Sequence, residues 1–131
     1  MLVVPPRLVR QVVRPETAQR AREAMTVVVE RGTGKAAAFP GYTVAGKTGT
    51  AQKSDGYRYV AGRLYCSFVG MFPASQPELV IAVAVDEPQG DAYGGTVAAP
   101  VFREIAEQAA ALYQIAPDKK PQLSPRTYLS R

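Results

Sequence analysis

The residues best suited to chemistry form one short run, Gly46-Lys47-Thr48-Gly49-Thr50. A carboxylate ligand needs a cation and hydroxyl donors, which Lys47, Thr48 and Thr50 offer. Alternate side chains of a strand share a face, so both threonine hydroxyls can meet one carboxylate. Gly49 lets a peptide lie close to the strand, and the N–H of Thr50 can point at a developing oxyanion. The plain alternative is an ordinary strand with a tight glycine.

A second chemistry competes for the same run. Together with Gly41 it matches the phosphate-loop pattern G-x-x-x-x-G-K-[ST] over residues 41–48. That motif needs a strand before its first glycine and a helix that starts at its lysine, so that backbone amides face the phosphates. Pro40 precedes Gly41 directly, and Gly49 interrupts any helix that would follow. Nucleotide binding therefore stays as the less favoured alternative.

Missing residue types narrow the chemistry. The 131 residues contain no His, which excludes a Ser-His-Asp triad, a Cys-His dyad and a histidine metal site. The one cysteine, Cys66, excludes an internal disulfide and a multi-cysteine zinc site, and its apolar neighbours predict a packing role. There is also no Asn. We expect no cofactor and no metal.

The net charge of +5 comes from basic residues that are scattered along the chain. A nucleic-acid interface needs a clustered basic patch, so we predict a solvated surface and no nucleic-acid partner. The longest apolar run, residues 79–85, is far shorter than the roughly 20 residues of a membrane-spanning helix. Pro5, Pro6 and Arg7 interrupt the start of the chain. We therefore expect no membrane segment and no signal peptide here.

Hydrophobic periodicity predicts the elements that position the run. Three- and four-residue spacing predicts a helix that Pro15 enters, with Thr17 as candidate N-cap and Gly32 as its stop. After it, short β-branched and small residues predict a strand around the run. The predicted β segments are a first strand at 42–52, a polar aromatic loop or hairpin arm at 57–63, and strands at 64–72 and 79–85.

The strand at 79–85 is apolar on both faces, so we expect a central strand that is covered on both sides. A second helix follows, with Thr96 as its cap and Pro100 in its first turn. Its predicted buried stripe is Val101, Ile105, Ala109 and Leu112.

The predicted fold class is α+β, with three antiparallel strands and flanking helices over residues 1–116. Residues 2–13 are predicted as extended chain or an edge strand. Residues 117–131 are polar and proline-spaced, which predicts a disordered tail. The two helices can cover one face of the sheet, whereas nothing in the pattern covers the other.

The chain resembles the class B (monofunctional) penicillin-binding proteins, the cell-division and elongation transpeptidases, over residues 5–116. The run resembles their third conserved box. The segments that carry the resemblance, in the family's order, are the helix from Glu16 to Gly34, 44–53, 67–73, 79–88 and 93–102. The resemblance implies a five-stranded antiparallel sheet between helices, the penicillin-binding and serine β-lactamase-like sandwich. This chain would hold an incomplete part of it.

The resemblance also implies an activity. It implies a peptidoglycan D,D-transpeptidase, a penicillin-sensitive serine acyl-transferase. Its substrate-binding residues here would be Lys47, Thr48, Gly49 and Thr50, and its ligand a stem peptide or a β-lactam. The family works outside the cytoplasmic membrane, in the periplasm or cell envelope, and its N-terminal anchor is absent from this sequence.

The sequence departs from the family at the nucleophile, which sits in S-x-x-K, with a second box S-x-N. No serine here has a lysine three residues later, and S-x-N is impossible without Asn. The near-miss Thr50-Ala-Gln-Lys53 lies on the docking strand itself. We therefore expect the nucleophile in a missing N-terminal part of the domain, and an inactive isolated chain. A non-catalytic module that binds peptide carboxylates is the alternative.

Overall fold

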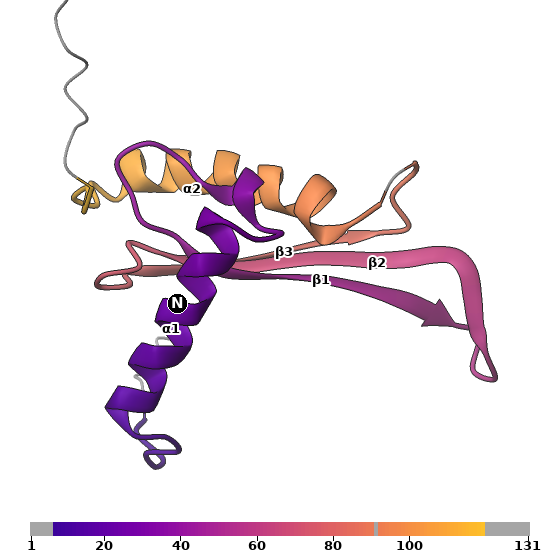
Figure 1. Ribbon diagram of the computed structural model, residues 1–131, viewed down its shortest axis with the longest axis horizontal. Helices are drawn as coiled ribbons and strands as arrows, with labels where there is room; N and C mark the ends of the chain where they lie inside the picture. The colour runs from indigo at the N-terminus through magenta and orange to yellow at the C-terminus, as the bar shows by residue number, and fades with distance from the viewer. Residues whose placement is uncertain (1–6, 91, 120–131) are drawn as a thin grey trace, which may run out of the picture.

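The computed structural model describes residues 7–90 and 92–119 as a helix, three strands and a second helix (Figure 1). The main elements are α1 (Pro15–Glu30), β1 (Ala45–Ser54), β2 (Tyr59–Phe72), β3 (Leu79–Asp86) and α2 (Ala99–Leu112). A short 3-10 helix, η1 (Lys35–Ala37), precedes β1, and a π-helical segment, η2 (Gly94–Ala98), leads into α2. This order confirms the predicted α+β class.

The three strands form one antiparallel sheet in the order β1-β2-β3, and α2 lies across one of its faces (Figure 1). β1 is therefore an edge strand in the described sheet. β3 is the other edge, with β2 as its only described neighbour, and Val80 on its open face is 64% exposed. Within the described residues β3 therefore pairs on one side only and α2 covers one of its faces, so neither the predicted central position nor the second cover is found in this part of the fold.

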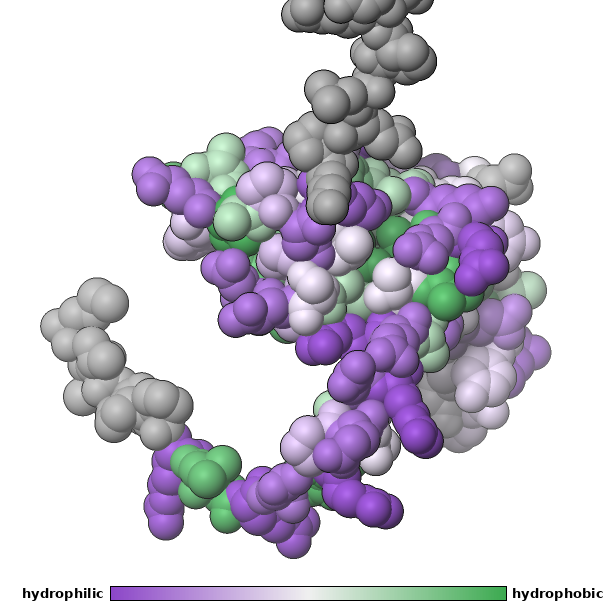
Figure 2. Space-filling model, turned by 60° about the vertical axis from the view of Figure 1, so that its left-hand side comes forward, coloured by the Kyte–Doolittle hydropathy of each residue, from purple (hydrophilic) through white to green (hydrophobic). Residues whose placement is uncertain are grey.

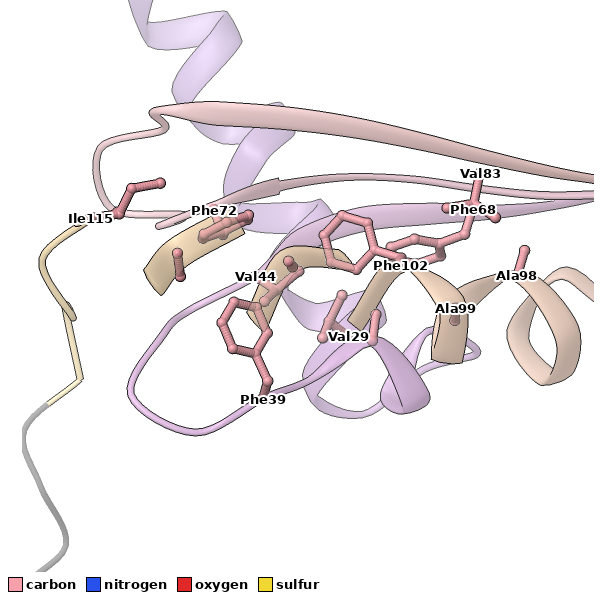
Figure 3. Packing of buried hydrophobic residues seen from close by; sticks show 13 residues of the cluster. Val29, Phe39, Val44, Phe68, Phe72, Val83, Ala98, Ala99, Phe102 and Ile115 are labelled. Atoms are coloured by element: carbon pink, nitrogen blue, oxygen red, sulfur yellow. The ribbon is translucent and has the colours of Figure 1, made fainter. Parts of the chain in front are cut away.

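The core lies between α2 and the covered face of the sheet. Phe68 and Phe72 of β2 and Phe102 of α2 are fully buried, and the rings of Phe68 and Phe102 lie 4.9 Å apart, edge to face (Figure 3). Aromatic rings bury a large area each, so this contact dominates the packing of α2 on the sheet. The same contact positions β2 against α2, and β1 is paired to β2.

The predicted buried stripe of α2 is wrong at three of its four residues, and only Ala109 packs against the core, partly buried. Val101, Ile105 and Leu112 are 40%, 42% and 75% exposed, while the buried residues of α2 are Ala99, Phe102, Ala106 and Ala110. The helix carries apolar residues on two faces, so periodicity alone does not select between them. The face with one phenylalanine among alanines packs on the sheet because small residues let the helix approach closely.

Helix α1 starts earlier than predicted. Pro15 occupies its first turn, Arg14 is the N-cap residue, and the backbone N–H of Thr17 donates to the Arg14 carbonyl at 3.0 Å. Thr17 is thus inside the helix, and its prediction as N-cap is wrong. Only Val29 of α1 is buried. Met25, Thr26 and Val28 are half-buried where the C-terminal half of α1 packs near β1, and the N-terminal half stands away from the body as a largely hydrophilic arm (Figure 2).

The segments at the two ends are only partly described. Residues 7–14 are irregular and exposed, with no strand among them. At the other end Asp118 accepts hydrogen bonds from Thr43 and Ser75, so residues 117–119 contact the body. The rest of the predicted tail lies outside the described residues. Neither described helix is long and apolar enough to cross a membrane.

Candidate functional site

Strand β1 presents two different faces to its surroundings. Its register pairs Lys47, Thr48, Gly49 and Thr50 with Val69, Phe68, Ser67 and Cys66, respectively. Phe68 and Cys66 are fully buried on the side that α2 covers. Thr48 and Thr50 therefore share the covered face at the sheet edge, and Lys47 lies on the open face.

A hollow of about 460 Å³ adjoins the covered face of β1. It lies between β1, the residues that follow α1, and η2. Its lining residues within the described chain are Thr33, Lys35, Ala36, Thr48, Thr50, Tyr93, Gly94, Gly95 and Thr96. The structure thus brings the two predicted threonines into one concavity rich in hydroxyl groups.

Backbone and side-chain hydrogen bonds orient both threonine hydroxyls. The N–H of Gly94 donates to Oγ1 of Thr50 at 3.1 Å, and the Oγ1 atoms of Thr33 and Thr48 lie 2.9 Å apart. An amide N–H can only donate, so Thr50 accepts and its own hydroxyl proton is available for a ligand. The Thr33–Thr48 pair can be donor and acceptor in either direction.

The close approach of η2 to the strands depends on Gly94. A Cβ atom at this position would lie 2.3 Å from the Ser67 carbonyl oxygen and 2.5 Å from that of Gly49. No side chain fits at such distances, so only glycine lets the η2 backbone donate to Thr50. No sequence pattern predicted this role for Gly94. The Gly94-Gly95 pair, directly before a helix start, was the available signal.

Lys47 is outside the hollow. Its ammonium group is exposed and donates to the Thr48 carbonyl oxygen at 2.8 Å. Its cross-strand partner on the open face is Val69, which is 45% exposed. Lys47 can therefore meet only a group that approaches the sheet from the open face or over its edge.

Lys53, the lysine of the T-x-x-K sequence that resembles the family's S-x-x-K motif, forms ion pairs with acidic residues. Its Nζ lies 2.9 Å from Asp86 and 2.8 Å from Glu87, and Arg63 also contacts Glu87 at 2.6 Å. Hydrogen bonds to Glu87 and then to Asp86 raise the pKa of Lys53, so it stays charged. A general base must be unprotonated, and Lys53 therefore does not activate Thr50.

The phosphate-loop interpretation is wrong. Lys47 and Thr48 lie within a strand, paired with Val69 and Phe68, where the motif needs the first turn of a helix. The segment before Gly41 is a 3-10 turn followed by irregular chain. The backbone N–H groups of residues 41–48 therefore do not converge on a phosphate site.

A protein-family model described as the penicillin-binding protein transpeptidase domain matches residues 3–107. The chain belongs to this transpeptidase family. The match confirms the resemblance that the K-T-G run and its surrounding segments indicated. It also covers all three parts that form the hollow, namely β1, η2 and the residues that follow α1.

Named relatives and solved structures agree with the family. The chain is 44% identical over 116 residues to the probable peptidoglycan D,D-transpeptidase PbpC of Pseudomonas aeruginosa, covering 87% of this chain and 20% of that protein. The transpeptidase domain of Burkholderia pseudomallei penicillin-binding protein 3 matches with a TM-score of 0.73 and 42% identity, over 81% of this chain and 33% of that one.

A second solved structure carries an antibiotic. Penicillin-binding protein 3 of Mycobacterium tuberculosis in complex with ampicillin matches with a TM-score of 0.70 and 35% identity, over 82% of this chain and 26% of that one. This chain thus spans a fifth to a third of the length of these three relatives.

Proposed function

We propose that this chain supplies the substrate-docking strand of a peptidoglycan D,D-transpeptidase. Lys47, Thr48, Gly49 and Thr50 are its docking residues, and a stem peptide or a β-lactam is the ligand. The observation that carries the proposal is the hollow beside β1, in which the Thr48 and Thr50 hydroxyls lie together. The Gly94 amide leaves the Thr50 hydroxyl as a donor, which suits a carboxylate, a group that only accepts.

The docked peptide lies along the edge of the sheet in this proposal. β1 has one free edge in the described sheet, so its outward backbone groups can pair with an extended ligand. Gly49 leaves room for close approach, and the N–H of Thr50 is the candidate oxyanion donor. Lys47 orients and polarises the reacting groups from the open face and does not attack.

The serine nucleophile comes from outside this chain in our proposal, since no serine here has a lysine three residues later. The N-terminal part of the transpeptidase domain supplies it and covers the open face, where Val69 and Val80 are 45% and 64% exposed. The isolated chain is then inactive. The complete protein works on the outer side of the cytoplasmic membrane, where relatives named as peptidoglycan transpeptidases have their substrate.

Fluorescent-penicillin labelling tests the proposal. The sample is the reconstituted domain, meaning this chain combined with the N-terminal portion of the Burkholderia pseudomallei transpeptidase domain. We expect label on the partner's serine in the reconstituted domain and none on the isolated chain. Label on the isolated chain would reveal an unrecognised nucleophile here. A folded but unlabelled reconstituted domain would favour a non-catalytic carboxylate-binding module.

A further inference from the structure

Thr33 lies at the hollow although it precedes β1 by many residues and belongs to no predicted motif. Its Oγ1 lies 2.9 Å from that of Thr48. The chain packs closely around it: a Cβ atom added at Gly95 would lie 2.2 Å from the Thr33 carbonyl oxygen, and the N–H of the next residue, Gly34, donates to the Val28 carbonyl of α1 at 3.0 Å. Thr33 is therefore held between η2 and β1.

A carboxylate in the hollow would set the direction of the Thr33–Thr48 hydrogen bond. A carboxylate has no proton to give, so Thr48 must donate to it. The Thr48 oxygen can then accept from Thr33. In this state Thr33 does for Thr48 what the Gly94 amide does for Thr50. Both docking hydroxyls become outward donors, each supported by a donor behind it.

The positive charge in the hollow comes from Lys35. Lys47 lies on the opposite face of β1, whereas Lys35 lines the hollow at the first residue of η1. Among residues 7–90 and 92–119, no carboxylate forms an ion pair with Lys35, and no acidic residue lines the hollow. Lys35 is thus the one charged side chain among the described residues that line this hollow.

We propose that Thr33 and Lys35 complete the carboxylate-binding site on the covered face of β1, with Thr33 as a positioning residue for Thr48 and Lys35 as the cation. This inference rests on the proposed function. Selectivity for a carboxylate would then depend on the segment between α1 and β1 as well as on β1, which carries Lys47, Thr48 and Gly49.

Lys35 also lines a second hollow, where it could have a structural role. The test must distinguish this role from carboxylate binding. This hollow, of about 410 Å³, lies beside α1, and its lining includes Lys35, Glu30 and Lys119. A lysine that served Glu30 there would contribute to stability but would not distinguish charged from uncharged ligands. Lys119 lines the second hollow but not the first. It is therefore the matched control for the loss of a lysine charge.

The experiment compares acylation of the reconstituted domain by benzylpenicillin and by its methyl ester, which lacks the carboxylate charge. The variants are Thr33→Val, Thr33→Ser, Lys35→Gln and the control Lys119→Gln. We expect Thr33→Val to slow acylation by benzylpenicillin about 10-fold and to leave the ester rate nearly unchanged. Thr33→Ser should restore most of the lost rate. Lys35→Gln should lower the ratio of the benzylpenicillin rate to the methyl-ester rate several-fold, and Lys119→Gln should leave this acid-to-ester ratio unchanged.

Two results would overturn the inference while the proposed function stands. One is an equal slowing of both substrates, which indicates a structural role for Thr33 or Lys35. The other is an unchanged acid-to-ester ratio in both Thr33→Val and Lys35→Gln. A wild-type reconstituted domain that penicillin does not label would defeat the proposed function itself, and this inference with it.

Discussion

On the covered face of the sheet, η2 and α2 pack on the strands, and Thr48 and Thr50 receive hydrogen-bond partners from Thr33 and Gly94. On the open face, Lys47 lies in an exposed setting beside Val69, which is 45% exposed. One chain thus builds the hydroxyl side of the site completely and leaves the lysine side open. In our proposal the covered face is therefore preorganised to dock a carboxylate, whereas the chemistry around Lys47 depends on what covers the open face.

The largest expected effect comes from removing the close approach of η2. Gly94→Ala places a Cβ atom against two backbone carbonyl oxygens, and we expect a loss of about 3 kcal/mol in the unfolding free energy of the reconstituted domain. Denaturant unfolding measures it. The control is Gly56→Ala, where nothing lies within 4 Å of the added Cβ. Only the positive φ of +100° is unfavourable there, and it should lower the unfolding free energy by about 1 kcal/mol. Equal small losses would contradict the packing argument.

Loss of one docking hydroxyl should slow the reaction without unfolding the protein. Thr50→Val keeps the shape of the side chain but removes the donor to the ligand, and we expect penicillin acylation to slow by about 10- to 100-fold. Rate constants on the reconstituted domain provide the measurement, with Thr50→Ser as the control that retains the hydroxyl. Unchanged acylation kinetics would refute the role assigned to the covered face.

The open face should make the isolated chain associate, because exposed apolar surface drives association. We expect Val80→Lys to raise the monomer fraction in sedimentation velocity. The control Val27→Lys changes another exposed valine, 43% exposed against 64% for Val80, which lies on α1 away from the open face, and it should have little effect. A wild-type chain that is a monodisperse, cooperatively unfolding monomer would show that the open face needs no cover.

The smallest effect is expected at Asp118, which contacts the chain ahead of β1 and belongs to neither face. It accepts from the Thr43 N–H at 2.6 Å and from the Ser75 hydroxyl at 2.7 Å. Burial raises the pKa of Asp118, but the hydrogen bonds from Thr43 and Ser75 outweigh burial, and the net pKa lies below the usual 3.8.

A lowered folded-state pKa gives stability that is present above the unfolded pKa and is lost as the pH falls through the folded pKa. Asp118→Asn should therefore lower the melting temperature at neutral pH, and the difference should shrink as the pH falls below 3.8 and through the lower folded-state pKa. Thermal unfolding across this range measures the effect, with penicillin acylation at neutral pH nearly unchanged. A difference that persists undiminished at low pH would rule out the carboxylate as its source.

The sequence predicted those features that follow a local period. Strand alternation placed Thr48 and Thr50 on one face, and the order of helix and strand patterns matched the fold. The choice of buried face on α2 failed because Ile105 and Phe102 lie on two apolar faces of one helix. Only the contact between Phe102 and Phe68 decides which face packs.

The parts of the site that sequence analysis missed depend on contacts between distant segments. Thr33 meets Thr48 across 15 positions, and Gly94 meets Thr50 across 44. Both partners lie in irregular or π-helical segments, which have no amphipathic period to reveal their orientation. A glycine pair and a threonine before a short turn carry information only once the register of the sheet is known.

The most direct test of the account is a crystal structure of the reconstituted domain acylated by benzylpenicillin. We predict that the antibiotic's carboxylate lies on the covered side of β1, with an oxygen at a hydrogen-bond distance of about 2.7 Å from the hydroxyl of each of Thr48 and Thr50. A carboxylate on the open face beside Lys47, or one that contacts neither threonine, would contradict the account.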